Sequence, residues 1–258
     1  MNNITVAQTP STDWTPTVIR SPRKTPARST DGMDTVLLAS LGHDLRTRLT
    51  IIGGAASNLK EPWLSTDDRH EQSDLILAEV ARLNWLLQNI LEIGRIDTSV
   101  TAVERRWADP TEIVIAARRL VEHMLQEHQV DLVVDFESLV RLDMRLTATA
   151  LAHLLENAAE YSPAGSSIHV IVREVDDQLV IQVRDHGPGI PLPDLSHLFE
   201  RFYRGATGRK LRSGTGLGLW ITERLLGAQH GRVWAENCPD GGARFTMAVP
   251  IEVHELEA

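Results

Sequence analysis

Three short segments of the chain carry residue types that could do chemistry together. The first, Gly42–Thr50, places His43 beside Asp44 and four residues before Thr47. A neutral imidazole is a nucleophile near pH 7, because the unperturbed pKa of histidine is about 6.5, and a carboxylate can support the lost proton. Most histidines are ordinary surface side chains and ten occur here, so this segment alone is a weak indication of catalysis.

Two glycine-rich segments farther along the chain could hold a nucleotide. They are Asp185–Ile190 and Gly214–Leu219, the second preceded by a basic stretch at 205–213. Glycines let the backbone approach a ligand closely, and free N–H groups at a helix start favour phosphate. Gly214–Leu219 is not a dinucleotide fingerprint, because Leu219 stands where the third glycine belongs, and it is not a P-loop, because no Gly-Lys-Ser/Thr occurs.

Two polar residues beside these segments could contact a nucleotide directly. Asp185 continues the alternation of apolar residues at 179–183, so its carboxylate is predicted to face inward, where an adenine amino group could be its donor. A turn-capping aspartate is the alternative. Asn157 lies in the apolar helical segment 154–161 and could offer a neutral oxygen to Mg²⁺, the alternative being a capping or surface asparagine.

Composition restricts the class of protein. The 258 residues suffice for two domains, and the net charge of −9 argues against nucleic acid as the partner. The single cysteine, Cys238, cannot form an internal disulfide, which fits a reducing compartment. No apolar run reaches the roughly 18–20 residues of a membrane helix, so we expect a cytoplasmic chain without a membrane segment.

The chain is predicted to divide into a helical part and an α/β part, an α+β fold overall. Apolar residues at helical spacing predict two helices that form a hairpin. One hairpin leaves an apolar stripe uncovered, so we predict a homodimer that closes a four-helix bundle, the alternative being packing on the chain's own second domain. The predicted parts are a disordered basic arm (1–31), the hairpin (32–98), a linker (99–110), a second domain (111–252) and a tail (253–258).

The second domain is predicted to be an α/β sandwich with helices beside a mostly antiparallel sheet. Helices are expected at 111–127, 146–160 and 216–229, and strands near 130–136, 168–173, 179–185, 232–236 and 244–250. In the first hairpin helix, His43 lies about 200° from the stripe residue Leu45 and is expected to face solvent, with Thr47 on the same face.

Together these segments resemble the catalytic core of bacterial sensor histidine kinases. Five motifs occur in the family's order and approximate spacing, over residues 34 to 250. They are similar to its phosphoacceptor box (His43–Thr47), asparagine box (Leu154–Tyr161), first glycine box (Asp185–Ile190), phenylalanine box (Leu198–Arg204) and second glycine box (Gly214–Leu219). Residues 37–59 and 241–245 most resemble potassium-sensing, KdpD-type kinases.

The resemblance implies a fold, a reaction and a set of site residues. The fold would be a dimerising hairpin followed by a Bergerat-type ATP-binding domain, and Mg-ATP would phosphorylate His43 before transfer to an aspartate of a response regulator. Asp44 and Thr47 would position a water for dephosphorylating the regulator, and Asn157 would ligate Mg²⁺. ATP would be contacted by Asn157, Tyr161, Asp185, Gly187, Gly189, Ile190, Phe199, Arg204, Gly214, Thr215, Gly216, Leu217, Gly218 and Leu219.

Three residues depart from the family's pattern. Arg48 stands where a proline is usual, Glu160 where a lysine or arginine usually meets the phosphates, and His153 where an asparagine is common. These departures leave open a kinase-weakened docking module that binds, sequesters or dephosphorylates a response regulator. A serine-directed kinase or an ATPase of the same superfamily is a third alternative. Nothing before Met33 reads as a sensor, so the stimulus is expected to come from an upstream sensor protein or a missing sensor domain.

Overall fold

The computed structural model describes residues 31–97, 103–136, 138–205 and 216–254. The described chain divides into two compact units, a helical hairpin up to Glu92 and an α/β unit from Ile93 onward. The predicted arm at 1–31, except Asp31, and the tail beyond His254 lie outside the described residues. Within the part that is described, no helix has the length and apolar character needed to cross a membrane.

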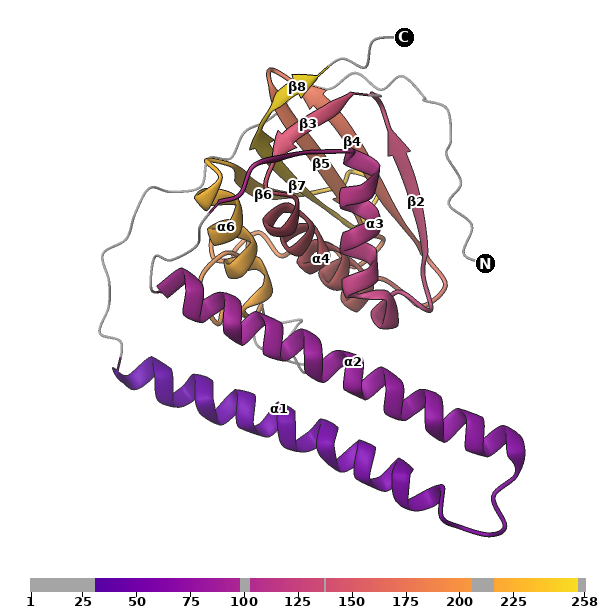
Figure 1. Ribbon diagram of the computed structural model, residues 1–258. Helices are drawn as coiled ribbons and strands as arrows, with labels where there is room; N and C mark the ends of the chain where they lie inside the picture. The colour runs from indigo at the N-terminus through magenta and orange to yellow at the C-terminus, as the bar shows by residue number, and fades with distance from the viewer. Residues whose placement is uncertain (1–30, 98–102, 137, 206–215, 255–258) are drawn as a thin grey trace. The chain divides into compact units, whose positions relative to one another are not determined.

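The hairpin consists of α1 (Asp31–Asn58) and α2 (Thr66–Asp97), which run antiparallel (Figure 1). Their connection is held by Arg69, whose guanidinium donates to three backbone carbonyls of the connection, those of Leu59, Glu61 and Leu64. At the start of α2 the Ser65 hydroxyl accepts from the Asp68 N–H at 3.1 Å, which satisfies one free N–H of the first turn. The connection between the two helices thus covers residues 59–65.

A charged cluster occupies the seam between the two hairpin helices. Arg48 donates from Nη1 to Oε2 of Glu79 across the seam at 3.0 Å, and Arg82 donates to the other oxygen of the same carboxylate. The Glu79 side chain is only 3% exposed. Arg48 therefore takes part in an ion-pair cluster that links α1 to α2, at a position where the family usually has a proline.

Both hairpin helices also keep large apolar side chains in solvent. These are Leu49 and Ile51 on α1 and Leu75, Leu77, Val80, Leu87 and Leu91 on α2. Exposed apolar surface of this extent is unusual and marks these faces of the hairpin as candidate interaction surfaces.

The α/β unit is built on a five-stranded sheet in the order β2-β4-β5-β7-β6. Only β2 and β4 pair in parallel, so the predicted mostly antiparallel sheet is confirmed. The helices α3, α4 and α6 cover one face of the sheet (Figure 1). The bounds are α3 (Pro110–Leu120), β2 (Gln129–Val134), α4 (Met144–Tyr161), β4 (Ser167–Val175), β5 (Gln178–Arg184), α6 (Gly218–Ala228), β6 (Arg232–Asn237) and β7 (Ala243–Pro250).

Short elements around this core were not predicted from the sequence. The strands β1 (Arg106–Ala108), β3 (Leu139–Leu142) and β8 (Glu252–His254) form a second sheet, and η1 (Glu122–Met124) follows α3. Three or four residues are too few to show an alternating pattern. The strand β1 falls within the predicted linker 99–110, and α3 ends at Leu120 rather than near 127.

The helix α4 is the centre of the α/β unit and carries the asparagine motif. Its start is capped by Asp143, whose carboxylate accepts from the Leu146 N–H at 3.0 Å. Eleven of its side chains are buried, because α3, α6 and the sheet surround it. Because α4 packs against α3, α6 and the sheet, the positions of Asn157 and Tyr161 on its last turns are fixed within the α/β unit.

Candidate nucleotide and phosphoacceptor sites

Asp185 lies at the end of β5 with only 3% of its surface exposed, so the prediction that it faces inward is confirmed. Its Oδ1 accepts from the Gly187 N–H at 2.8 Å and from the Ala243 N–H at 3.0 Å. No described residue donates to its other oxygen, Oδ2. One oxygen therefore fixes the carboxylate, while the second is left for another donor.

Burial raises the pKa of the Asp185 carboxyl above its ordinary value, although the two backbone N–H groups act in the opposite direction. A carboxylate in this environment gains from any donor that reaches its second oxygen. An exocyclic amino group such as that of adenine has the required chemistry.

The loop that follows Asp185 fits closely between two other elements. A Cβ atom on Gly187 would lie 2.8 Å from the Tyr161 carbonyl oxygen at the end of α4. Gly189 has a φ of +77°, and a Cβ there would lie 3.0 Å from Oδ1 of Asn237, the last residue of β6. Each of these glycines is thus required by a specific close approach.

Asn237 is a site residue that sequence reasoning missed. Its Oδ1 accepts from the Ile190 N–H at 2.6 Å, and its Nδ2 donates to the Ile190 carbonyl at 2.7 Å. It lies 47 positions from Ile190 in the sequence, at the end of a strand, and no local motif marks it.

Asn157 and Tyr161 are half-buried on the last turns of α4. Within the described part of the chain, the Asn157 carboxamide has no hydrogen bond, so its oxygen can act as a ligand. No group of three or more His, Cys, Asp or Glu among the described residues could hold a metal. An Mg²⁺ ion here would rely on Asn157, phosphate oxygens and water, and this ligand set fits the ion's usual preference.

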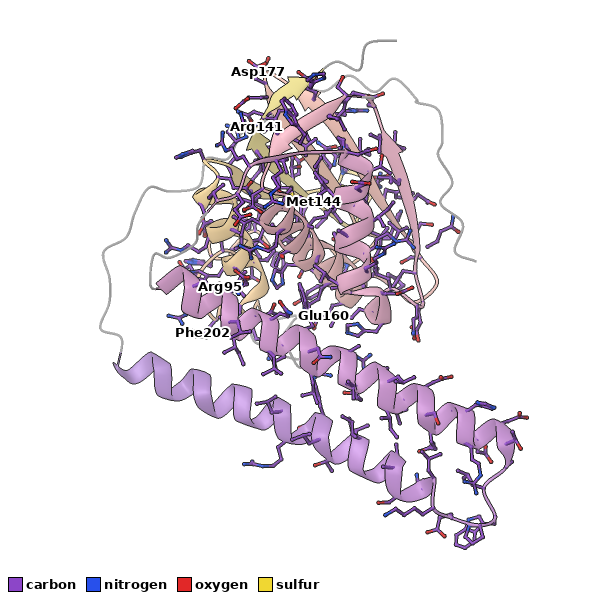
Figure 2. The ribbon with its side chains drawn as sticks, in the orientation of Figure 1. Arg95, Arg141, Met144, Glu160, Asp177 and Phe202 are labelled. Atoms are coloured by element: carbon purple, nitrogen blue, oxygen red, sulfur yellow. The ribbon has the colours of Figure 1, made fainter. Side chains whose placement is uncertain are left out.

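Charged residues surround the Tyr161 hydroxyl. Burial, followed by the charge of Glu160, raises the pKa of Tyr161, and Asp194 acts in the same direction. Arg204 acts oppositely. Glu160, labelled on the last turn of α4 in Figure 2, therefore brings negative charge to the tyrosine expected to line the adenine pocket.

The phenylalanine and second glycine motifs meet at a single point. The Phe202 N–H donates to the Gly216 carbonyl at 3.0 Å, and Gly216 has a φ of +67°. A Cβ on Gly216 would lie 2.8 Å from the Phe202 carbonyl carbon, so a larger residue would not fit. The Arg201 guanidinium lies 5.0 Å from the ring of Trp220 on α6, which adds a cation–π contact. Figure 2 labels Phe202.

The second glycine motif continues directly into α6. Leu217 is buried and Gly218 begins the helix, where a Cβ would lie 3.1 Å from Nδ1 of the buried His153. His153, which stands where the family commonly has an asparagine, therefore lies against the start of α6. The cap residue Leu217 provides no side-chain hydrogen bond to the first turn, a feature that suits phosphate at this helix end. Leu219 is half-buried.

The predicted site residues are distributed over both units. The α/β unit brings Tyr161, Asp185, Gly187, Gly189 and Ile190 together, while Phe199 is half-buried in the phenylalanine motif. His43 and Asp44 lie on α1, but their side chains, like all of Gly214 and Thr215, lie outside the described residues. Thr47 is exposed on α1.

Two family models match the chain, one for each unit. Residues 34–99 match the His Kinase A (phospho-acceptor) domain. Residues 143–253 match the histidine kinase-, DNA gyrase B- and HSP90-like ATPase. The first match includes His43, and the second includes every predicted nucleotide residue.

Individual relatives agree with these domains. The chain is 32% identical over 224 residues to the signal transduction histidine-protein kinase AfsQ2 of Streptomyces coelicolor, covering 83% of this chain and 41% of AfsQ2. It is 32% identical over 223 residues to the sensor protein KdpD of Escherichia coli, covering 86% of this chain and 25% of KdpD. The chain thus spans less than half of either relative.

A solved structure supports the fold. The histidine kinase ThkA, in its complex with the response regulator protein TrrA, superposes with a TM-score of 0.55 at 21% identity. The superposition covers 85% of this chain and 63% of that chain.

Proposed function

Because the chain belongs to the sensor histidine kinases, we propose that it transfers the γ-phosphoryl group of ATP to His43. The observation that carries the donor half of this proposal is Asp185, a buried carboxylate with one oxygen fixed by backbone and the other left for a ligand. Since ATP is the phosphoryl donor, we place the reaction in the cytoplasm.

The proposed nucleotide site assigns a role to each part of the α/β unit. Asp185 accepts a hydrogen bond from adenine. Tyr161 and Ile190 line the adenine pocket, and Gly187 and Gly189 contact the nucleotide. Phe199, Arg204, Gly214, Thr215 and Gly216 contact the nucleotide. The start of α6, at Leu217, Gly218 and Leu219, faces the phosphates, and Asn157 ligates Mg²⁺. Mg²⁺ supplies charge neutralisation for phosphoryl transfer.

The hairpin supplies the acceptor in this proposal. His43 is the nucleophile, and Asp44 supports the proton that it loses. An aspartate of a response regulator then receives the phosphoryl group. The solved structure of ThkA, which has a similar fold, is a complex with the response regulator protein TrrA. Asp44 and Thr47 would also position water when the regulator is dephosphorylated.

A homodimer is the proposed assembly of the hairpin. Two hairpins that joined their exposed apolar faces would bury side chains of both α1 and α2, among them Leu49, Leu77 and Leu91. The closed arrangement is a four-helix bundle. The stimulus would reach this dimer from an upstream sensor protein or domain.

The direct test is incubation of the purified chain with Mg²⁺ and γ-labelled ATP, beside His43→Gln. We expect acid-labile label on the wild type and none on the variant, because phosphohistidine is acid-labile. Acid-stable label, or equal label on His43→Gln, would contradict the assignment and favour a serine-directed kinase of the same superfamily.

A second candidate function is supported by Glu160. Its charge raises the pKa of Tyr161, and it stands where a lysine or arginine of the family usually meets the phosphates. A carboxylate there would repel phosphates, which suits a docking module that binds a response regulator and sequesters or dephosphorylates it. A folded wild-type chain that binds ATP but takes up no label would favour this function over the kinase.

A further inference from the structure

The strongest feature that the proposed function leaves unused is the contact between Asn237 and Ile190. We propose that Asn237 is a positioning residue, which holds the Ile190 backbone so that the loop 187–190 is in place before nucleotide binds. This inference rests on the proposed assignment of Asp185–Ile190 to the adenine end of ATP.

The Asn237 side chain bonds to both the N–H and the carbonyl of Ile190, as a neighbouring strand does in an antiparallel sheet. Oδ1 accepts from the Ile190 N–H at 2.6 Å, and Nδ2 donates to the Ile190 carbonyl at 2.7 Å. Only a carboxamide offers an acceptor and a donor side by side at this length. If the Asn237 amide were rotated by 180°, its NH₂ group would face the Ile190 N–H and its oxygen would face the Ile190 carbonyl. The hydrogen bonds therefore define the orientation of the amide.

Gly189 is part of the same arrangement. Its missing side chain leaves the space next to Asn237 Oδ1, since a Cβ would lie only 3.0 Å from that oxygen. The φ of +77° at Gly189 turns the backbone so that Ile190 faces the carboxamide. The close approach of Asn237 is thus a reason for a glycine at position 189, in addition to any contact with a ligand.

The other end of the loop is fixed by Ala243, the first residue of β7, which pairs with Asn237 of β6. Asp185 receives the Ala243 N–H on Oδ1, and its own N–H donates to the Ala243 carbonyl at 2.9 Å. The Cys238 N–H donates to the Gly242 carbonyl at 3.0 Å, which closes the turn. The paired strand ends that flank the β6–β7 turn therefore hold the loop at both ends, Ala243 at the start of β7 and Asn237 at the end of β6.

This placement predicts how loss of Asn237 acts. Without the carboxamide, Ile190 loses both hydrogen bonds to Asn237, while the start of the loop stays held at Asp185 and His186. Nucleotide must then order Ile190 as it binds. Two lost hydrogen bonds predict a dissociation constant for ADP about tenfold higher. Chemistry at saturating ATP should change less than about twofold, because Asn237 contacts no reacting group.

The experiment uses the full chain and titrates ADP into the wild type, Asn237→Ala and Asn237→Asp by calorimetry. We expect weaker binding by both variants, because an aspartate cannot donate to the Ile190 carbonyl. Gln129→Ala is the matched control, since Gln129 is also an exposed amide in a hydrogen bond, at the start of β2. It should bind as the wild type does. The KM for ATP should rise in both Asn237 variants while kcat stays nearly constant.

Hydrogen exchange separates positioning from a general loss of structure. We expect faster exchange at the Ile190 amide in Asn237→Ala, with the amides of β5 and α4 unchanged. Equal affinity of the wild type and Asn237→Ala, or Asn237→Asp binding as tightly as the wild type, would overturn the inference. A wild type that binds no ADP would instead contradict the proposed function.

Discussion

Glu79 in the hairpin and Asp185 in the α/β unit are both buried carboxylates, and the two are stabilised in different ways. In the hairpin, Glu79 is contacted by two cations, Arg48 and Arg82, one on each oxygen. In the α/β unit, Asp185 is contacted by two backbone N–H groups on a single oxygen. Glu79 therefore accepts on both oxygens, whereas Asp185 has one oxygen to which no described residue donates a hydrogen bond.

The difference indicates what each carboxylate does. A fully paired carboxylate in a helix seam links two elements and has no remaining capacity for a ligand. A buried carboxylate with a free oxygen and a raised pKa is less favourable for the fold alone, and such groups cluster at functional sites. We infer that Glu79 is structural and that Asp185 is functional.

Asp185→Asn separates these two roles most strongly. The amide keeps an oxygen for the Gly187 and Ala243 N–H groups but presents an NH₂ group where adenine would donate. We expect at least about a 100-fold loss of ADP affinity, because a buried donor would then face a donor. Calorimetry measures the affinity, and an unchanged melting temperature shows that the fold is kept. Wild-type affinity would contradict the functional role.

Glu79→Ala should have the opposite profile. It leaves Arg48 and Arg82 unpaired in the seam, and we expect a loss of about 2 kcal/mol in stability, below the usual cost for a fully buried pair because both arginines are partly exposed. ADP affinity should not change. Urea unfolding followed by circular dichroism measures the loss, with the exposed Glu71→Ala on α2 as the control. A loss of ADP affinity would end the distinction between the two carboxylates.

Arg48→Ala tests the position where the family usually has a proline. Glu79 keeps Arg82 as a partner, so we expect a smaller loss of about 1 kcal/mol. The exposed Arg46→Ala on the same helix is the control and should change stability little. Equal unfolding curves for both variants would show that the Arg48–Glu79 pair adds nothing to the hairpin.

Glu160→Lys sharpens the electrostatics of the nucleotide site. A cation at position 160, where the family usually has a lysine or arginine, should attract the phosphates. We therefore expect ADP to bind about threefold more tightly at low salt, with the gain shrinking as salt is added. The control is Glu174→Lys, an exposed residue of β4 with the same change of charge. Equal gains in both variants would mean that only net charge matters.

The pH dependence of stability gives the smallest expected effect. Because the pKa of Asp185 is raised in the folded state, its protonated form favours folding, and this contribution is lost as the pH rises through the folded pKa. Relative to Asp185→Asn, the wild type should therefore gain stability as the pH falls from neutral through the raised pKa towards the ordinary range of a carboxyl group. Urea unfolding of both proteins across that range measures the difference. A gain in the opposite direction would contradict the cause assigned to the pKa.

The sequence predicted the two units and the inward-facing Asp185, because long helical stripes and alternating strands have a clear period. It could not predict β1, β3 and β8, which are too short to show one. The sequence also did not show which distant residues contact Arg48 and Ile190. Arg48 was noted as a departure, but the 31 positions that separate it from Glu79 carry no local signal, and Asn237 is equally remote from Ile190.

The most direct measurement pairs labelling with binding in three proteins: the wild type, His43→Gln and Asp185→Asn. We predict label from γ-labelled ATP only on the wild type. His43→Gln should still bind ADP with wild-type affinity, whereas Asp185→Asn should bind little. This pattern would assign the donor site to Asp185 and the acceptor to His43. Label on Asp185→Asn at the wild-type level, or on His43→Gln, would contradict it.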